Sequence, residues 1–134
     1  MLLLPVTAFY ASILALIYLY LTALVIRCRR QNLIGVGDGG NDVLQRLIRV
    51  HGNFVEYVPL CLILLAVLEI NSHSTLIIHL LGGSLVLGRV LHAYGLRHSV
   101  GATWQRLVGM VLTLLTLFVI ACINLTLIYW MPFL

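Results

Sequence analysis

The chain has 134 residues, of which 62% are hydrophobic and 9% are charged, and its formal net charge is +4. Soluble domains carry about 25% charged and about 45–50% apolar residues, and a soluble protein of this size would leave too much apolar surface in water. The composition excludes soluble enzymes, disordered tails and disulfide-stapled secreted modules, and it predicts a single membrane domain over residues 1–134.

The first apolar segment covers about residues 6–26 without a charge and stops at Arg27, Arg29 and Arg30. A helix needs about 20 apolar residues to cross the hydrocarbon core. Because the segment lacks the basic start of a signal peptide and is longer than its usual core, we interpret it as a retained transmembrane helix.

A glycine-rich loop, residues 35–40, precedes the second span, which covers about residues 42–70. The loop has no Lys-Ser/Thr pair after it and no strand before it, so we interpret it as a hairpin loop rather than a phosphate cradle. Asn41 or Asp42 is expected to be the N-cap of the second helix. The first half of this helix is amphipathic and the second half is wholly apolar.

Two further spans cover about residues 75–96 and 103–130. The predicted fold is therefore an all-α integral membrane protein with four transmembrane helices. The three cysteines have no C-x-x-C spacing, and we interpret them as small hydrophobic residues.

The arginines predict how the chain is oriented in the membrane. The hairpins after the first and third spans carry Arg27, Arg29, Arg30 and Arg97, whereas the loop at 71–74 has no basic residue. By the positive-inside rule, the two basic hairpins face the cytoplasm, and both termini and the 71–74 loop face the opposite side. Because the arginines lie beside apolar spans, we do not expect nucleic acid as a partner.

One face of the second span carries four polar side chains, Arg46, Arg49, Asn53 and Glu56. Their spacing of three, four and three residues confines them to an arc of about 80°. Pro59 follows Glu56 and removes a backbone hydrogen bond beside this carboxylate, which we expect to be buried in the wall of a pocket. Ionisable groups in a bilayer helix are costly and indicate a functional site by default.

The later spans add cationic and hydrogen-bonding groups at a similar depth, namely Arg89, His92, Tyr94 and Arg106. One interpretation is a structural network in which Glu56 neutralises an arginine and an asparagine ties helices together. However, one carboxylate neutralises only about one of these arginines, and unpaired buried guanidinium groups are costly. The excess predicts a small anionic ligand near the cytoplasmic end.

The remaining polar residues are weaker candidates. Glu69 and His73 flank the 71–74 loop and are expected to be solvated, and His98 is expected in a loop. His79 is expected to pack between helices rather than to bind a metal, because no second ligand lies at metal-binding spacing.

The run from Arg46 to Pro59 has the pattern R-x-x-R-x-x-x-N-x-x-E-Y-x-P. It resembles the signature of the membrane-associated proteins in eicosanoid and glutathione metabolism (the MAPEG family), and the chain is most similar to a short bacterial member. Residues 88–92 and 106–109 resemble the later family blocks, and the likeness covers about residues 6–130. The resemblance implies a homotrimer in the bacterial inner membrane, with glutathione bound between neighbouring subunits near the cytoplasmic face.

The resemblance also implies roles for individual residues. The residues expected to contact glutathione are Arg49, His51, Asn53, Glu56, Tyr57, Arg89, His92 and Tyr94. Arg106 corresponds to the arginine near the thiol and is the expected catalytic residue. Further candidates are Arg46 and one of Arg27, Arg29 and Arg30. Several eukaryotic members carry tyrosine where this chain has Leu96, and Tyr94, two residues away, points elsewhere on a regular helix.

Glutathione has two carboxylates and one amine, so Arg49 and Arg89 are expected to bind carboxylates and Glu56 the amine. Arg106 would stabilise the thiolate, which attacks a lipophilic electrophile or hydroperoxide arriving through the lipid. The resemblance thus implies a glutathione-dependent transferase or peroxidase without a metal.

Two alternatives remain open. The first is a non-catalytic lipid- or anion-binding scaffold, because the family includes a member that binds lipid without catalysis. The second is a small four-helix drug exporter, although residues 6–26 lack the membrane carboxylate that such exporters carry in their first helix.

Overall fold

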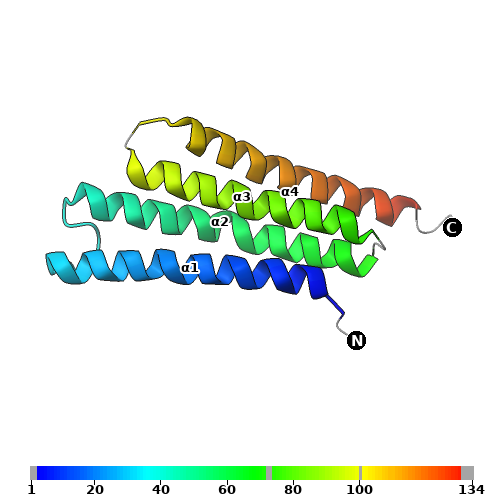
Figure 1. The fold of residues 1–134 in the computed structure, drawn as a ribbon, viewed down its shortest axis with the longest axis horizontal. Coiled ribbons are helices and arrows are strands. Elements are labelled where there is room, and N and C mark those ends of the chain that lie inside the picture. The colour runs from blue at the N-terminus through cyan, green and yellow to red at the C-terminus, as the bar shows by residue number, and fades with distance from the viewer. Residues whose placement is uncertain (1–2, 72–73, 100, 131–134) are drawn as a thin grey trace.

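The computed structural model describes residues 3–71, 74–99 and 101–130. They form four α-helices, α1 (Pro5–Asn32), α2 (Asp42–Asn71), α3 (Thr75–His98) and α4 (Trp104–Trp130). The helices lie side by side in an up-down-up-down bundle (Figure 1), and each is long and apolar enough to cross a membrane. The predicted all-α fold with four membrane helices is confirmed.

The first helix is longer than the predicted span, because it continues past residue 26 to Asn32. Arginine is a good helix former, and Arg29 and Arg30 in the last turn lie where positive charge complements the helix dipole. The helix therefore carries its basic turn beyond the apolar span. His98, expected in a loop, is the last residue of α3.

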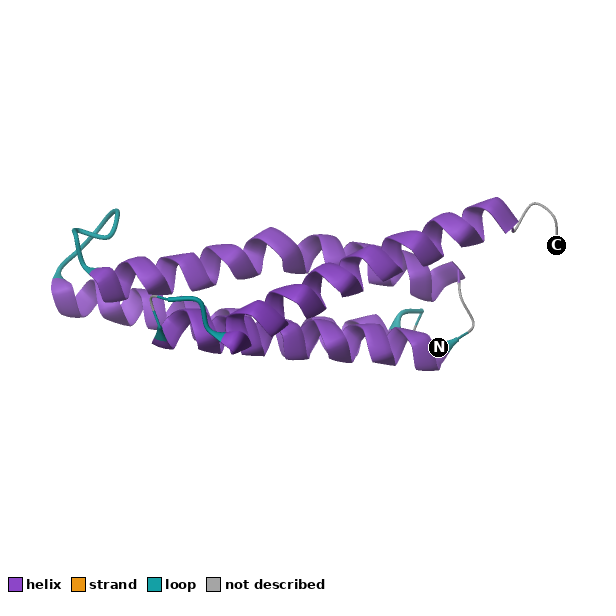
Figure 2. Cartoon of the chain, turned by 90° about the horizontal axis from the view of Figure 1, so that it is seen from above, coloured by secondary structure: helices purple, strands orange, loops and turns teal. Residues whose placement is uncertain are grey.

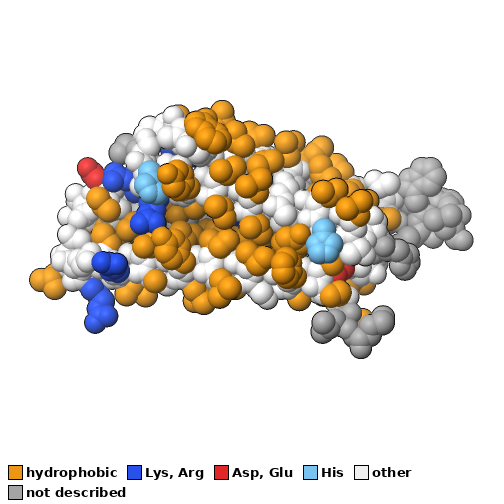
Figure 3. All heavy atoms as spheres, viewed as in Figure 1, with side chains coloured by type: hydrophobic (Ala, Val, Ile, Leu, Met, Phe, Trp, Pro, Cys, Tyr) orange, Lys and Arg blue, Asp and Glu red, His pale blue; other side chains and the backbone are white. Residues whose placement is uncertain are grey.

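All connections rich in arginine lie at one end of the bundle. The α1–α2 loop lies beside the end of α3 and the start of α4, and the start of α1 and the end of α4 lie at the opposite end (Figures 1 and 2). We call the first of these the arginine end (residues 27–46 and 97–106). On the face in Figure 3, basic side chains gather at this end, whereas hydrophobic side chains cover the middle.

The bundle has four side faces. Helix α1 packs against α2 and α3, and α4 also packs against α2 and α3. The faces are therefore α1/α2, α2/α4, α4/α3 and α3/α1. The largest buried apolar cluster includes Leu14 and Leu21 of α1, Phe54 and Val58 of α2 and Leu85 of α3.

Glycines bring α3 and α4 into close contact near the arginine end. A Cβ atom at Gly109 would overlap the backbone of His92 and the carbonyl oxygen of Gly88, and one at Gly95 would lie 2.7 Å from the amide nitrogen of Arg106. Small residues of this kind allow membrane helices to approach closely. The close approach places His92 beside the first turns of α4.

Glu69 was expected to be solvated, but its carboxylate binds the start of α1 instead. Its two carboxylate oxygens accept hydrogen bonds from the backbone N–H groups of Val6 (2.9 Å) and Thr7 (2.7 Å). The first turn of α1 has no acidic residue and no local side-chain cap. Because free N–H groups at a helix start are costly in lipid, a carboxylate from α2 takes the place of a local cap. His73 lies outside the described residues.

The α1–α2 loop is held by its own residues. Asn41 Oδ1 accepts a hydrogen bond from the Leu44 N–H (3.0 Å), which confirms Asn41 as one of the two predicted N-cap residues. Gly37 and Gly39 adopt positive φ values of 70° and 58°, which a glycine tolerates without strain. The Arg29 guanidinium donates to the carbonyl oxygen of Gly37 (2.8 Å) and so ties the loop to α1.

His79 contacts α1 from α3, as a helix-contact residue was predicted to do, although its side chain is exposed. Its Nδ1 atom lies 3.1 Å from the Tyr10 hydroxyl oxygen, and the two rings contact edge to face with centroids 5.7 Å apart. This contact joins α1 to α3 far from the arginine end.

Candidate functional site

The polar stripe of α2 divides between the inside and the outside of the subunit. Arg49 and Glu56 lie on the outside, with side chains 64% and 52% exposed, and Arg49 Nη1 is 3.9 Å from Glu56 Oε1. The expectation that Glu56 is buried is therefore wrong for a single subunit. The residues of α2 that face the bundle, such as Val50 and Phe54, point about 100–160° away from Arg49 and Glu56 around the helix.

Arg89 is the most deeply buried charged residue in the described part of the chain, with only 1% of its surface exposed. Its Nη2 atom donates to Asn53 Oδ1 (3.0 Å), and its Nη1 atom donates to the Asn53 carbonyl oxygen (3.4 Å). Its guanidinium carbon lies 5.7 Å from the centre of the Tyr57 ring, within range of a cation–π interaction. Its Nε atom has no hydrogen-bond partner among the residues that the structure describes.

This contact fixes the orientation of Asn53. A guanidinium group carries only donors, so the amide oxygen of Asn53 must face Arg89. The Asn53 amide nitrogen, with two N–H donors, is then directed away from Arg89. Arg89 thereby positions a neutral donor on the side of α2 that faces α4.

A cavity of about 410 Å³ opens beside Asn53. Its lining comes from α2, α3, α4 and the segment before α4, namely Asn53, His92, Ala102, Thr103, Arg106, Leu107 and Met110. Three helices thus bring Asn53, His92 and Arg106 to one cavity at the arginine end. These three residues were predicted to act together.

The cavity is electropositive. Arg49 and Glu56 form the one ion pair within 4.0 Å in the described part of the chain. Arg89 and Arg106 therefore have no carboxylate within that distance among the described residues. Arginine and asparagine donors without a protein anion are suited to bind a small anion or to stabilise a thiolate.

Two predicted contacts lie on other faces of the bundle. His51 lies on the α1/α2 face, where its Nε2 atom is 3.1 Å from Thr22 Oγ1 and its ring centre is 4.9 Å from that of Tyr18. Tyr94 lies on the α3/α1 face, where it lines a different hollow together with Tyr20 and Arg97. Within one subunit, His51 and Tyr94 therefore do not line the cavity that contains Arg106.

The remaining candidate arginines do not line the cavity either. Arg29 and Arg30 line a surface hollow of about 440 Å³ beside the α1–α2 loop, and Arg27 is exposed. Arg46 is half-buried, and its Nε atom has no hydrogen-bond partner in the described part of the chain. The Arg29 guanidinium donates to the carbonyl oxygens of Gly35 and Gly37 in the α1–α2 loop, so it stabilises the loop rather than the cavity.

Four lining residues were missed in the sequence, Ala102, Thr103, Leu107 and Met110. Thr103 Oγ1 accepts a hydrogen bond from the Arg106 backbone N–H (3.3 Å), so it caps the start of α4. A threonine three residues before Arg106 is a capping signal that could have identified it. Met110 lies four residues after Arg106, on the same side of the helix, and this spacing was also available.

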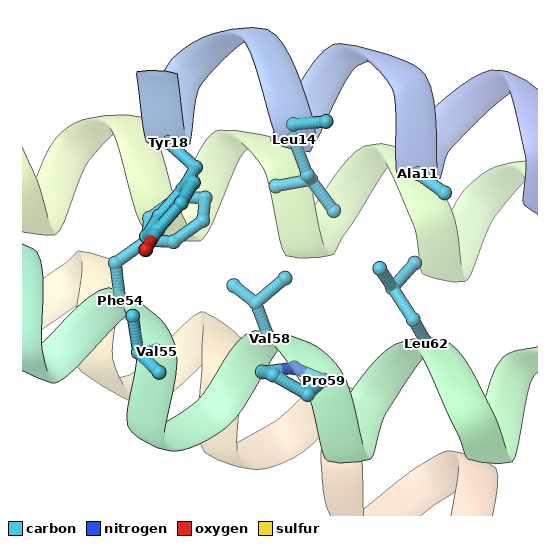
Figure 4. A pocket seen from close by; sticks show the side chains of 9 residues that line it. Ala11, Leu14, Tyr18, Phe54, Val55, Val58, Pro59 and Leu62 are labelled. Atoms are coloured by element: carbon cyan, nitrogen blue, oxygen red, sulfur yellow. The ribbon is translucent and has the colours of Figure 1, made fainter. Parts of the chain in front are cut away.

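An apolar groove of about 240 Å³ runs along the α1/α2 face. Figure 4 shows Leu14 and Tyr18 of α1 opposite Val58 and Pro59 of α2. The ring of Tyr18 stacks on Phe54 with centroids 6.3 Å apart. Tyr18, at one end of this lining, also contacts the His51 ring.

Comparisons with known proteins show similarity in sequence over most of the chain. A sequence model of the MAPEG family matches residues 7–126. The chain is also similar to the inner membrane protein YecN of Escherichia coli strain K12, with 39% identity over 115 residues that cover 80% of this chain and 88% of YecN. The same values hold for YecN of Escherichia coli O6:H1.

Proposed function

This chain belongs to the MAPEG family, and from that membership and its electropositive cavity we propose that it is a glutathione-dependent membrane enzyme of the transferase or peroxidase type. Its four apolar helices and its similarity to an inner membrane protein indicate a multi-pass protein of the inner membrane. Its substrates in this proposal are glutathione and a lipophilic electrophile or hydroperoxide.

The observation that carries the proposal is the position of Arg89 and Arg106. Both guanidinium groups lack a carboxylate within 4.0 Å in the described chain, and Arg106 lines the cavity beside Asn53 and His92. A ligand with carboxylates and an ionisable thiol supplies the negative charge that the polypeptide does not. Glutathione carries both groups.

We assign the completed site to the contact between neighbouring subunits of a homotrimer. Arg49 and Glu56 are exposed on a helix that crosses the membrane, and charged groups facing lipid are costly. A neighbour that covers this side of α2 with its α1/α2 face would remove them from lipid. The same contact would bring the neighbour's copy of His51 toward the cavity.

In this site each charged group of glutathione has a partner. Arg49 contacts a carboxylate, Glu56 binds the amine and the Asn53 amide donates to a ligand oxygen. Arg89 is buried behind Asn53, so it holds Asn53 in place and attracts the carboxylates through its charge at longer range. Arg106 stabilises the thiolate. A tenfold increase in the thiolate fraction requires about 1.4 kcal/mol, and a close cation–anion pair at intermediate dielectric supplies several kcal/mol.

The thiolate sulfur then attacks the acceptor. With an electrophile, a carbon–sulfur bond forms and the leaving group departs with the electron pair. With a hydroperoxide, the sulfur bonds to the terminal oxygen, the O–O bond breaks and the departing alkoxide takes a proton to become an alcohol. A second glutathione then converts the resulting sulfenic acid to glutathione disulfide and water. The α1/α2 groove is lined by apolar residues and by Tyr18, whose ring contacts His51. It gives a lipophilic acceptor a path from the bilayer to the thiolate.

We orient the arginine end toward the cytoplasm, because six of the eight arginines lie in residues 27–46 and 97–106 and cytoplasmic loops are enriched in basic residues. Both termini then face the opposite side.

The first test is calorimetry with glutathione on the purified protein in detergent, followed by a conjugation assay with a generic aromatic electrophile. The proposal requires binding at millimolar concentration and turnover. Arg106→Ala should lower turnover at least about tenfold while glutathione affinity changes by less than about threefold, and Arg27→Ala is the matched control. An absence of binding would favour the alternative of a non-catalytic lipid- or anion-binding scaffold, and equal losses of binding and turnover would contradict the role of Arg106.

A further inference from the structure

A second hollow, of about 230 Å³, lies on the α3/α1 face. Its polar part, at the arginine end, is formed by Tyr20, Arg97 and His98, and its apolar part by Ile17, Leu21 and Val90. It shares no lining residue with the cavity that contains Arg106. Its function is therefore separate from that of the proposed glutathione site.

Arg97 is a cation without a protein anion. Its Nη1 atom donates to the Tyr20 hydroxyl oxygen (2.7 Å), and its guanidinium carbon lies 5.9 Å from the centre of the Tyr20 ring. It has no carboxylate within 4.0 Å among the residues that the structure describes. Because the Tyr20 oxygen accepts this bond, the hydroxyl hydrogen of Tyr20 is available to a ligand together with the other donors of Arg97.

His98 adds a third polar group. Its Nδ1 atom lies 2.8 Å from the Tyr94 carbonyl oxygen, which can only accept, so Nδ1 carries the hydrogen. Its ring also packs against the Tyr94 ring with centroids 4.3 Å apart. The Nε2 atom of the exposed His98 is then an acceptor in the neutral ring and a second donor in the imidazolium.

The apolar and polar parts follow one another along the helices. Ile17 on α1 lies about one helical turn nearer the bilayer centre than Tyr20, and Val90 on α3 lies about two turns nearer it than Arg97. Tyrosines and arginines at this depth are typical of the interface between hydrocarbon and headgroups. A phospholipid presents an acyl chain and a phosphate in the same order.

We propose that this hollow binds an anionic phospholipid of the leaflet at the arginine end. The lipid phosphate contacts Arg97, the Tyr20 hydroxyl and His98, and the first acyl carbons lie over Ile17, Leu21 and Val90. Basic side chains near the membrane surface attract anionic headgroups. The apolar part of the hollow selects a lipid over a soluble phosphate.

The test uses native mass spectrometry of the full-length protein in detergent, titrated with phosphatidylglycerol or phosphatidylcholine. The wild type should bind phosphatidylglycerol more tightly than phosphatidylcholine. Arg97→Gln should weaken phosphatidylglycerol binding about fivefold or more, whereas Arg27→Gln, which changes an exposed arginine outside the hollow, should change it less than twofold. Equal losses in both variants would indicate diffuse charge attraction and overturn the proposal.

Two further variants keep the test decisive if Arg97→Gln does not fold. Tyr20→Phe keeps the ring and removes the hydroxyl, and Val90→Trp fills the apolar part at an exposed position; each should weaken phosphatidylglycerol binding several-fold. Unchanged binding in both variants would overturn the proposal. Competition by inorganic phosphate at the same concentration as the lipid would also overturn the proposal. Loss of subunits from the oligomer in Arg97→Gln would overturn it too, because the α3/α1 face would then contact a second copy of the chain.

Discussion

The Arg89 guanidinium donates to the Asn53 side-chain oxygen across the contact between α3 and α2, at 3.0 Å. Arg89 is almost completely buried, and Asn53 lines the cavity that also contains Arg106. A buried cation thus holds a cavity residue in place, and stability and ligand binding are coupled at this pair.

Removing the Asn53 amide should destabilise the bundle. Asn53→Leu leaves Arg89 buried without its side-chain acceptor, and hydrogen bonds to charged groups contribute about 1.5–3 kcal/mol. The free energy of unfolding, measured by titration with a denaturing detergent, should fall by about this amount. The double variant Asn53→Leu/Arg89→Met should regain most of the loss, because no buried charge remains; a double variant that is no more stable than Asn53→Leu would contradict the coupling.

Glu69 should protect the first backbone amides of α1 from hydrogen exchange. Its carboxylate accepts hydrogen bonds from the N–H groups of Val6 and Thr7. Glu69→Ala should accelerate exchange at these two amides and lower stability by about 0.5–2 kcal/mol, the usual contribution of a helix cap. Glu56→Ala, which removes an exposed carboxylate from the same helix, is the control and should leave both amides protected.

Substituting alanine for Gly109 and for Gly52 should have different effects on the melting temperature. A Cβ atom at Gly109 overlaps the backbone of His92, whereas one at Gly52 meets no atom within 4 Å. Gly109→Ala should separate α3 from α4 and lower both the melting temperature and glutathione binding. Gly52→Ala should leave the melting temperature unchanged or raise it, since alanine favours a helix over glycine by about 1 kcal/mol. Similar melting temperatures for the two variants would exclude the close contact.

The composite site predicts a disulfide between subunits. After Cys122→Ala removes the exposed native cysteine, the double variant His51→Cys/Arg106→Cys should form covalent oligomers up to a trimer under mild oxidation, as seen on a denaturing gel. The matched double variant Tyr94→Cys/Arg106→Cys should remain monomeric on the same gel, because Tyr94 lies on the α3/α1 face. Cross-linking in the second variant alone would refute the proposed contact.

The sequence predicted the four helices, because each span is an apolar run that ends at arginines, glycines or polar turns. It also identified Asn53, His92 and Arg106, which the structure brings to one cavity. Their similar depth on three apolar spans, together with the resemblance to the MAPEG family, was sufficient for this.

Contacts between helices could not be predicted in the same way. Glu69 looked solvated because it is close to a loop, and only the packing of α2 on α1 shows that it meets an N-terminus. His51 lies in the same polar segment as Asn53, but the rotation of α2 directs it to Thr22 on α1. Periodicity gives the relative directions of two side chains on a helix, and it does not give the neighbour that each one meets.

The Glu69 carboxylate has a consequence for biogenesis. It belongs to the end of α2, yet it accepts hydrogen bonds from the first turn of α1. During synthesis, α1 emerges from the ribosome well before residue 69, so its leading amides must rely on water or lipid headgroups until α2 has been translated. The first two helices therefore reach their final state as an inserted pair, and the N-terminal turn is completed only when α2 has crossed.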